Sequence, residues 1–290
     1  MNNPLVSVIV PVFNRPQSAV NAVRSVLRQD FTELEVIVAD DGSSPPLELP
    51  EDVREDARVR HIRLARNSGA AAARNAGART ARGEWLAWLD SDDSWRPDKL
   101  TLQLAFLDSL EDRENVALAS GFEYVDMANN RDVRIPIPAS DPLLFFTGCW
   151  FAPGSSVILP KVLFERIGPY DERLRRLEDY DWFIRMALGG GRLEVVKKNL
   201  VTVSKGQMAP LETLREAGKL LLAKFEEIEE RLPPHALRRL RSYLHLVYAA
   251  SLLKHEGRKL QGLGHLALSL FFRPRLSLSP HHFWEQPGGK

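Results

Sequence analysis

Short apolar runs alternate with stretches of helical spacing through the first ninety residues of the chain. Each run contains β-branched or aromatic residues and has the length of a buried strand. The four strands predicted in this way are residues 6–12, 34–39, 59–64 and 85–89. Helices are predicted from Pro16 onward and over residues 69–80, the second of which is almost bare of large side chains. The alternation predicts an α/β fold with a mixed, mainly parallel sheet flanked by helices.

The pattern changes twice further along the chain. Residues 116–203 mix short strands with helices, and one helix that begins near Asp179 is expected to end at the glycines of residues 189–191. Beyond Met208 the spacing predicts a region of long helices. We therefore expect a main α/β domain over 1–208, with halves 1–115 and 116–208, and a helical C-terminal region over 209–290.

The C-terminal helices are predicted at residues 211–232, 236–254 and 260–272. Four histidines, at positions 235, 245, 255 and 265, recur every ten residues in this region. Ten residues are not a whole number of helical turns, so we expect these side chains to fan around the helices rather than converge on a metal.

Composition limits the classes of function. A hydrophobic fraction of 44% and a charged fraction of 27% are ordinary for a globular protein, and a net charge of +1 argues against a nucleic-acid binder. The single cysteine, Cys149, allows no intrachain disulfide and fits a reducing compartment. The first residues carry no basic signal region, and no apolar run approaches the ~20 residues of a spanning helix. We expect a cytoplasmic protein that at most rests on the inner face of a membrane.

Two acidic clusters follow two of the predicted strands. Asp40 and Asp41 end the second strand, and Asp90, Asp92 and Asp93 follow the fourth. If parallel pairing brings these strands side by side, the carboxylates meet at the edge where open sheets bind ligands. Carboxylate oxygens suit Mg²⁺ or Mn²⁺, which usually take one or two carboxylates together with substrate phosphates. The alternative is that these aspartates form turns and cap helices.

Four sequence motifs in order resemble family 2 glycosyltransferases of the GT-A fold. They are Ser7-Val8-Ile9-Val10-Pro11-Val12-Phe13-Asn14-Arg15, Asp40-Asp41-Gly42-Ser43, Asn67-Ser68-Gly69 with Ala73-Arg74-Asn75-Ala76-Gly77, and Leu89-Asp90-Ser91-Asp92-Asp93. With Gly168-Pro169-Tyr170-Asp171 and Glu178-Asp179-Tyr180-Asp181, the resemblance spans about residues 5 to 205. It implies an inverting enzyme that moves a sugar from a nucleotide diphosphate to an acceptor hydroxyl.

The resemblance also implies roles for particular residues. The nucleotide sugar would be bound by Pro11, Phe13, Asn14, Asp41, Arg74, Asp90 and Ser91. Of these, Pro11, Phe13 and Arg74 would line the nucleobase pocket and Asp41 would accept hydrogen bonds from the base. Asp90 would face the ribose or the metal, and Asp92 would ligate the Mn²⁺ or Mg²⁺ ion that bridges the diphosphate. For Arg74 the alternative is a solvated charge on a helix.

By the same resemblance Asp179 is the general base that removes the proton of the acceptor hydroxyl. Neighbouring carboxylates should raise the pKa of Asp179, which suits a base. The alternative for Asp179 is a helix-capping role, which we favour for Asp181 and leave open for Glu178. Relatives often carry a histidine near residues 203–207, where this chain has none, and Lys205 could contact the diphosphate instead.

The C-terminal region is basic, because Glu256 and Glu285 are its only acids from residue 231 onward, against ten Lys and Arg residues. Residues 260–275 combine leucines and phenylalanines with cations, a pattern typical of an interfacial helix. Further candidates for a membrane-facing or partner-facing surface are Trp150, Phe151, Phe271, Phe272 and Trp284. The alternative, which we favour, is that these residues pack the helices onto the catalytic domain. If they contact a membrane, the acceptor could be a lipid-linked saccharide, as in cell-surface polysaccharide assembly.

Three hypotheses follow. The first is a glycosyltransferase that acts on a saccharide or lipid-linked acceptor, and the second is a nucleotidyltransferase on a related sheet. The nucleotidyltransferase would need a Gly-rich basic loop after the first strand, where the chain has Phe13-Asn14-Arg15-Pro16. The third is a catalytically silent nucleotide-sugar-binding module, against which the presence of both Asp92 and Asp179 counts.

Overall fold

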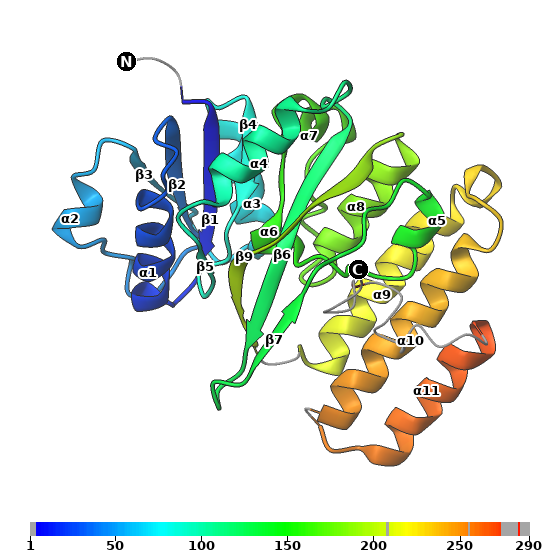
Figure 1. Ribbon diagram of the computed structural model, residues 1–290. Helices are drawn as coiled ribbons and strands as arrows, with labels where there is room; N and C mark the ends of the chain where they lie inside the picture. The colour runs from blue at the N-terminus through cyan, green and yellow to red at the C-terminus, as the bar shows by residue number, and fades with distance from the viewer. Residues whose placement is uncertain (1–3, 207–208, 255, 274–283, 285–290) are drawn as a thin grey trace.

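The computed structural model describes residues 4–206, 209–254, 256–273 and 284. In these residues nine strands form one sheet, helices cover both of its faces, and three long helices lie beside one end (Figure 1). The strands are β1 (Val6–Val12), β2 (Leu34–Asp40), β3 (Val59–Arg63), β4 (Trp85–Trp88), β5 (Ser94–Trp95), β6 (Val116–Val125), β7 (Arg131–Arg134), β8 (Ile158–Pro160) and β9 (Arg192–Ser204). The fold is the predicted α/β arrangement.

The helices alternate with the strands until β9 and then continue alone. They are α1 (Pro16–Leu27), α2 (Glu51–Arg54), α3 (Ala70–Thr80), α4 (Lys99–Asp108), α5 (Pro142–Phe145), α6 (Pro153–Ser156), α7 (Lys161–Ile167), α8 (Glu178–Leu188), α9 (Leu211–Glu226), α10 (Ala236–Lys254) and α11 (Lys259–Phe272). The first C-terminal helix is shorter than predicted, since α9 ends at Glu226 and a 3₁₀ turn (Glu229–Arg231) follows.

The N-terminal half of the sheet is parallel, in the order β3-β2-β1-β4. Every residue of β1 and β2 is buried, which explains why both sequences are nearly continuous apolar runs. One expectation needs correction: β2 and β4, the strands that precede the acidic clusters, are not neighbours, because β1 lies between them. All three strands still end at the same edge of the sheet.

The second half of the sheet is mixed. β8 pairs antiparallel with both β4 and β6, whereas β6 and β9 run parallel over ten residue pairs. The short strand β5 pairs with the C-terminal part of β9. This pairing brings the loop after β4 against the end of β9, so that the second acidic cluster lies next to Ser204.

Small residues let α3 approach the sheet closely. A methyl group added to Gly77 would lie 2.5 Å from Cγ2 of Ile9 in β1, a separation that real side chains do not show. Ala71, Ala73 and Ala78 are buried on the same helix. Because its side chains are small, α3 packs closely against β1. This packing places Arg74 of α3 at the edge of the sheet where the parallel strands end.

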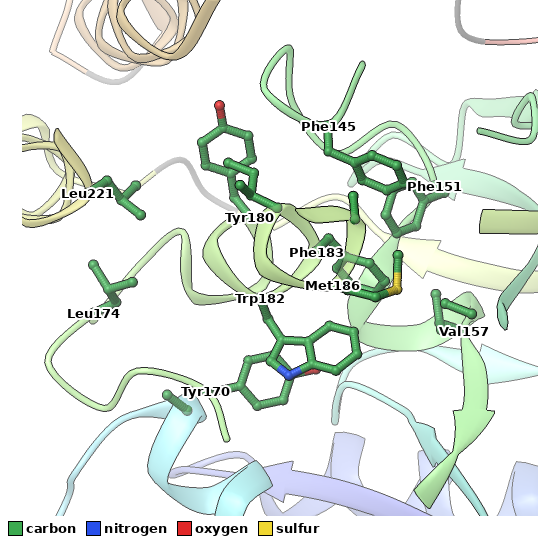
Figure 2. Packing of buried hydrophobic residues seen from close by; sticks show 14 of the residues in the cluster. Phe145, Phe151, Val157, Tyr170, Leu174, Tyr180, Trp182, Phe183, Met186 and Leu221 are labelled. Atoms are coloured by element: carbon green, nitrogen blue, oxygen red, sulfur yellow. The ribbon is translucent and has the colours of Figure 1, made fainter. Parts of the chain in front are cut away.

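The largest part of the core surrounds α8, on the sheet face opposite α1 and α4. Trp182 stacks on Phe164. Phe183 packs edge-on against Phe151 (Figure 2). The same cluster of buried residues includes Leu221 of α9. Side chains of the sheet, of α8 and of the C-terminal helices thus share one core.

Two of the residues expected to face a membrane or partner belong to this core. Trp150 is 4% exposed and Phe151 is fully buried, so the alternative that they pack inside the protein is correct for both. Phe271, in contrast, is 74% exposed. Within the described residues, no helix combines the length and apolar character needed to cross a membrane.

The histidine expectation is wrong for one pair. Nδ1 of His245 in α10 lies 2.8 Å from Nδ1 of His265 in α11. The spacing argument holds only within a single helix, whereas His245 and His265 lie on two separate helices, α10 and α11, that pack against each other. His255 lies outside the described residues.

Candidate functional site

The carboxyl ends of β1, β2 and β4 open into a cavity of about 910 Å³. Most of the residues singled out in the sequence line it: Pro11, Phe13, Asp41, Arg74, Asp90, Ser91, Asp92, Glu178 and Asp179. Asn14 and Lys205 are not among the lining residues. The Asn14 carboxamide oxygen accepts a hydrogen bond from the Ser44 N–H at 2.8 Å and thereby ties the loop after β1 to the loop after β2.

The two aspartates at the end of β2 differ in what they do. Asp40 is fully buried, and its carboxylate accepts the backbone N–H groups of Ser43 and Leu47. It holds the turn, so for this residue the turn-forming alternative is correct. Asp41 lines the cavity, and its two oxygens accept the N–H groups of Ser68 at 2.7 Å and Gly69 at 2.8 Å. Burial raises the pKa of Asp41, and these two amides partly offset the rise.

Arg74 is a buried cation that links three acidic residues of the cavity. It is 3% exposed, so the alternative of a solvated helix charge is wrong. Its guanidinium donates to Glu178 at 2.8 Å and to Asp90 at 2.6 Å, and it lies 3.6 Å from Asp179. A forked guanidinium can bind two carboxylates at once. Arg74 therefore offsets the repulsion among acids that come from β4 and α8.

Asp179 combines a raised pKa with a carboxylate oxygen that makes no hydrogen bond. Burial raises the pKa of Asp179 to about 7, the charge of Arg74 opposes the rise, and the charges of Glu178 and Asp90 add to it. Its Oδ1 atom has no hydrogen-bond partner among the described residues. Oδ1 is buried beside Arg74, while the side chain as a whole is 22% exposed at the cavity wall. A carboxylate that titrates near neutrality at such a wall can act as a general base toward a hydroxyl.

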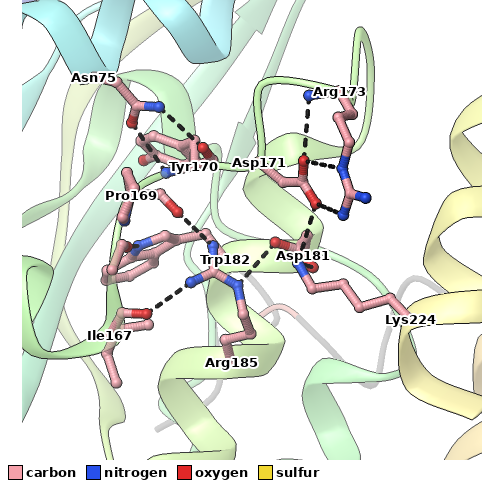
Figure 3. Close-up of polar contacts among 11 residues, drawn as sticks. Asn75, Ile167, Pro169, Tyr170, Asp171, Arg173, Asp181, Trp182, Arg185 and Lys224 are labelled. Atoms are coloured by element: carbon pink, nitrogen blue, oxygen red, sulfur yellow. Dashed lines mark hydrogen bonds and ion pairs between the residues drawn. The ribbon is translucent and has the colours of Figure 1, made fainter. Parts of the chain in front are cut away.

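The helix that carries Asp179 is held in place by ion pairs on its other side. The buried carboxylate of Asp181 contacts Arg185 at 2.9 Å and Lys224 of α9 at 2.7 Å (Figure 3). Lys224 also contacts Asp171, which in turn binds Arg173 (Figure 3). Asp181 lies in the first turn of α8, as expected for a capping residue. It also joins α8 to α9, a role that the capping expectation did not include.

The cluster after β4 offers oxygen ligands for a cation. Asp90 and Asp92 line the cavity; Asp90 pairs with Arg74, and Asp92 pairs with Arg15, whose side chain is 54% exposed. No group of three or more His, Cys, Asp or Glu side chains in the described part of the chain is arranged to hold a metal. One or two carboxylates nevertheless match Mg²⁺ and Mn²⁺, because substrate phosphates complete their coordination. The residues present fit such an ion.

Asp93 is turned away from this role. It is 7% exposed, its carboxylate accepts hydrogen bonds from the Ser155 hydroxyl and the Ser204 N–H, and burial raises its pKa to about 8. It fastens the acidic loop to α6 and β9. All three aspartates of the motif border the cavity, but only the carboxylate of Asp93 is engaged in anchoring the loop.

Several lining residues were missed in the sequence. Arg15, Arg175 and Arg176 add positive charge to the wall, and Cys149 and Tyr243 come from parts of the chain that carry no motif. Tyr243, in α10, packs its ring 4.5 Å from the ring of Tyr180, the neighbour of Asp179. The cationic run of residues 173–176 just before the Glu-Asp pair was a signal that could have identified two of the arginines.

Comparisons with known proteins give a consistent picture. The model of the family described as "Glycosyl transferase family 2" matches residues 7–165. WcaA of Escherichia coli, a glycosyl transferase named for colanic acid biosynthesis, is 32% identical over 216 residues, which cover 71% of this chain and 75% of WcaA. The succinoglycan biosynthesis protein ExoO of Rhizobium meliloti is 32% identical over 202 residues, which cover 66% of this chain and 58% of ExoO.

Two solved structures share the fold. The S. aureus TarS fragment 1–349 in complex with UDP-GlcNAc has a TM-score of 0.65 and 23% identity, and the match covers 91% of this chain and 81% of that one. The mannosyltransferase PcManGT from Pyrobaculum calidifontis, in complex with GDP-Man and Mn²⁺, has a TM-score of 0.60 and 19% identity, with 95% and 77% covered. At these identities the likeness concerns the fold.

Proposed function

Because the chain belongs to glycosyltransferase family 2, we propose that it transfers a sugar from a nucleotide diphosphate to an acceptor hydroxyl by a single, inverting displacement. Family membership establishes a glycosyltransferase, as the resemblance predicted, and removes the nucleotidyltransferase and silent-module hypotheses. The donor, the metal and the stereochemistry belong to the proposal.

One observation carries the proposal: Asp41, Asp92 and Asp179 line the same cavity, although they lie in three separate parts of the chain. If these three aspartates lay at opposite ends of the molecule, or if protein side chains filled the cleft between them, they could not form a shared site. The arrangement supports nucleotide recognition near Asp41, diphosphate binding near Asp92, and proton removal at Asp179.

In the proposed reaction the carboxylate of Asp179 accepts the proton of the acceptor hydroxyl. The acceptor oxygen forms a bond to the anomeric carbon while the bond from that carbon to the diphosphate oxygen breaks. The electron pair of the broken bond leaves with the nucleotide diphosphate, and Asp179 later releases its proton to solvent. Attack from the face opposite the leaving group inverts the configuration.

The residues around Asp179 tune this step. Arg74 stabilises the carboxylate form, while burial and the charges of Glu178 and Asp90 favour the protonated form. Asp92, with Asp90, would hold a Mn²⁺ or Mg²⁺ ion, which when bound neutralises charge on the diphosphate. Arg15, beside Asp92, lies where it can contact the same phosphates.

The proposed donor is a nucleotide-diphosphate sugar, since the fold neighbours were solved with UDP-GlcNAc and with GDP-Man. The proposed acceptor is a saccharide, free or lipid-linked, in polysaccharide assembly, the process for which WcaA and ExoO are named. We place the enzyme in the cytoplasm, in keeping with its single free cysteine, and at the inner membrane face when the acceptor is lipid-linked.

A thermal-shift panel tests donor binding. Nucleotide diphosphates and their sugars are added to the wild-type protein with and without Mn²⁺. The compounds that carry one particular base should raise the unfolding temperature of the protein, and should raise it further when Mn²⁺ is present. A concentration of 100 Kd adds about 2.7 kcal/mol of stability. The Asp41→Asn variant should lose most of the response, because the amide changes the charge and one acceptor of the pocket. A panel in which no nucleotide shifts the wild type contradicts the proposal.

A further inference from the structure

Helix α11 is fixed to α10 by one face only. The Ser242 hydroxyl donates to the Ser269 carbonyl at 2.9 Å, and the Ser269 hydroxyl donates to the Ser242 carbonyl at 2.8 Å. A methyl group added to Gly262 would lie 2.6 Å from Leu253 Cγ, so the two helices touch closely at this point as well. These contacts determine which side of α11 faces away from the protein.

The outward side of α11 is apolar. Leu260, Leu263, Leu268 and Phe271 are 86%, 56%, 43% and 74% exposed, respectively. With the exposed Gly264 and Ala267, they lie within about 140° of the helix circumference. A surface helix normally turns polar residues outward. Here the exposed face is the hydrophobic one, and α11 is the outermost of the three C-terminal helices (Figure 1).

The positive charge near this face of α11 favours an anionic partner. Residues 232–273 contain seven Lys and Arg residues and one acid, Glu256, which is paired with Arg258 at 3.2 Å. Lys254, Arg258 and Lys259 are exposed next to the first turn of α11. A second copy of the chain would bring the same positive charge to the contact, whereas an anionic lipid surface attracts it.

We propose that the outer face of α11 docks this glycosyltransferase onto anionic phospholipid bilayers. Leu260, Leu263, Leu268 and Phe271 enter the interface between headgroups and acyl chains, and the cations at the start of the helix contact the headgroups. The docking surface stands on its own observations; its use in catalysis rests on the proposed function.

The position of α10 connects this surface to the candidate site. Ser242 and His245 of α10 contact α11, while Tyr243 of the same helix lines the cavity. Two helices, α11 and α10, thus lie between the bilayer and the cavity, and each is about 10 Å wide. The saccharide of a lipid-linked acceptor would extend past both helices to the wall formed by Tyr243.

Vesicle sedimentation with the full chain tests the docking surface. The wild type should pellet with vesicles made of equal parts phosphatidylcholine and phosphatidylglycerol but not with phosphatidylcholine alone, and the binding should weaken as salt is raised. The double variant Leu263→Gln/Phe271→Gln should bind the anionic vesicles at least about tenfold more weakly than the wild type. Both positions are exposed, so its unfolding temperature should match that of the wild type.

A matched control removes the same amount of exposed apolar surface elsewhere. Met127 is 98% exposed and Val162 is 56% exposed, and the variant Met127→Gln/Val162→Gln should bind anionic vesicles as the wild type does. The docking proposal is overturned if the wild type stays in the supernatant. It is also overturned if both double variants lose binding equally, or if the α11 variant only dissociates a wild-type dimer in sedimentation velocity and leaves vesicle binding unchanged.

The two proposals fail in different ways. If the wild type binds vesicles but no nucleotide diphosphate shifts its unfolding temperature, the docking surface stands and the proposed function fails. If nucleotides and Mn²⁺ stabilise both the wild type and the α11 variant equally but neither binds vesicles, the proposed function stands and the docking surface fails.

Discussion

The carboxylates of the candidate site depend on one buried cation, so replacing Arg74 by Gln should change the ionisation of Asp179. The guanidinium lies 3.6 Å from Asp179 Oδ1. At an effective dielectric constant of about 20, a charge pair at this distance is worth about 4–5 kcal/mol, or a factor of about a thousand in the ionisation constant. Because the pKa of Asp179 is already about 7, only about one molecule in a thousand would keep Asp179 ionised at pH 7 without Arg74.

The real loss will be smaller, since Asp90 loses the same partner and will itself take up a proton, which removes its repulsion of Asp179. We expect the Arg74→Gln rate at pH 7 to fall between about tenfold and a thousandfold, and the rising limb of the pH–rate profile, near pH 7 in the wild type, to move to higher pH. Loss of the cation also leaves buried charges unpaired, which should cost about 3–5 kcal/mol of folding stability.

The assay is nucleotide release with the donor identified by thermal shift, measured across pH at a temperature where every variant is folded. Arg74→Lys keeps a positive charge and should restore the position of the rising limb, although an ammonium cannot bridge two carboxylates in the same way. Arg79→Gln, on the exposed side of the same helix, should leave both rate and profile unchanged. A folded Arg74→Gln enzyme whose profile coincides with that of the wild type would refute the electrostatic account.

Three further predictions concern single side chains. Asp179→Asn should lower turnover by about 10²–10⁴-fold while the affinity for the nucleotide is kept. Because the folded-state pKa of Asp179 lies above its unfolded value of 3.8, the stability of the wild type should fall by up to about 4 kcal/mol as pH rises from about 4 through 7. Calorimetry should show a flatter dependence of stability on pH for the variant. Gly154→Ala would place a methyl group 2.3 Å from Asp90 Oδ2 and so displace this carboxylate. The extra thermal stabilisation of the nucleotide complex by Mn²⁺ should then disappear, and an unchanged Mn²⁺ response would show that Asp90 takes no part in binding the ion. Tyr243→Ala should raise KM for the acceptor but not for the donor, with Tyr243→Phe close to wild type, and equal effects on both substrates would contradict an acceptor-side role.

Much of the fold follows from local pattern. β1 and β2 are buried on both faces, and this produces the unbroken apolar runs that mark them in the sequence. The start of α1 at Pro16 and the close approach of α3 follow from the geometry of proline and from the absence of large side chains. These features depend on neighbours in the chain or on one sheet face, and the sequence contains that information.

The parts that were not predicted depend on distant contacts. β8 has three residues, and only its insertion between β4 and β6 makes it a strand. Only the family resemblance separated Asp41 from Asp40 in the sequence, because their physical difference lies in which one turns toward the amides of Ser68 and Gly69. His245 and His265 meet only because α10 and α11 fold back on each other.

The candidate site shows the same division. The motifs located most of the cavity wall, since motif residues follow strand ends and strand ends share an edge. The contribution of Tyr243 could not be seen, because α10 carries no motif and reaches the cavity only through its packing on Tyr180. The cationic partners of the acids were missed for a similar reason: Arg15 and Asp92 are far apart in the chain.

The shared core around α8 has a practical consequence for engineering acceptor preference. Leu221 and Phe225 of α9 and Leu240 and Leu244 of α10 are buried in the same cluster as Tyr180. A chimaera joined near residue 208, with a sheet from one relative and C-terminal helices from another, would force two unmatched apolar surfaces together directly behind α8. Successful exchanges should therefore transplant α8 along with the helices that cover it.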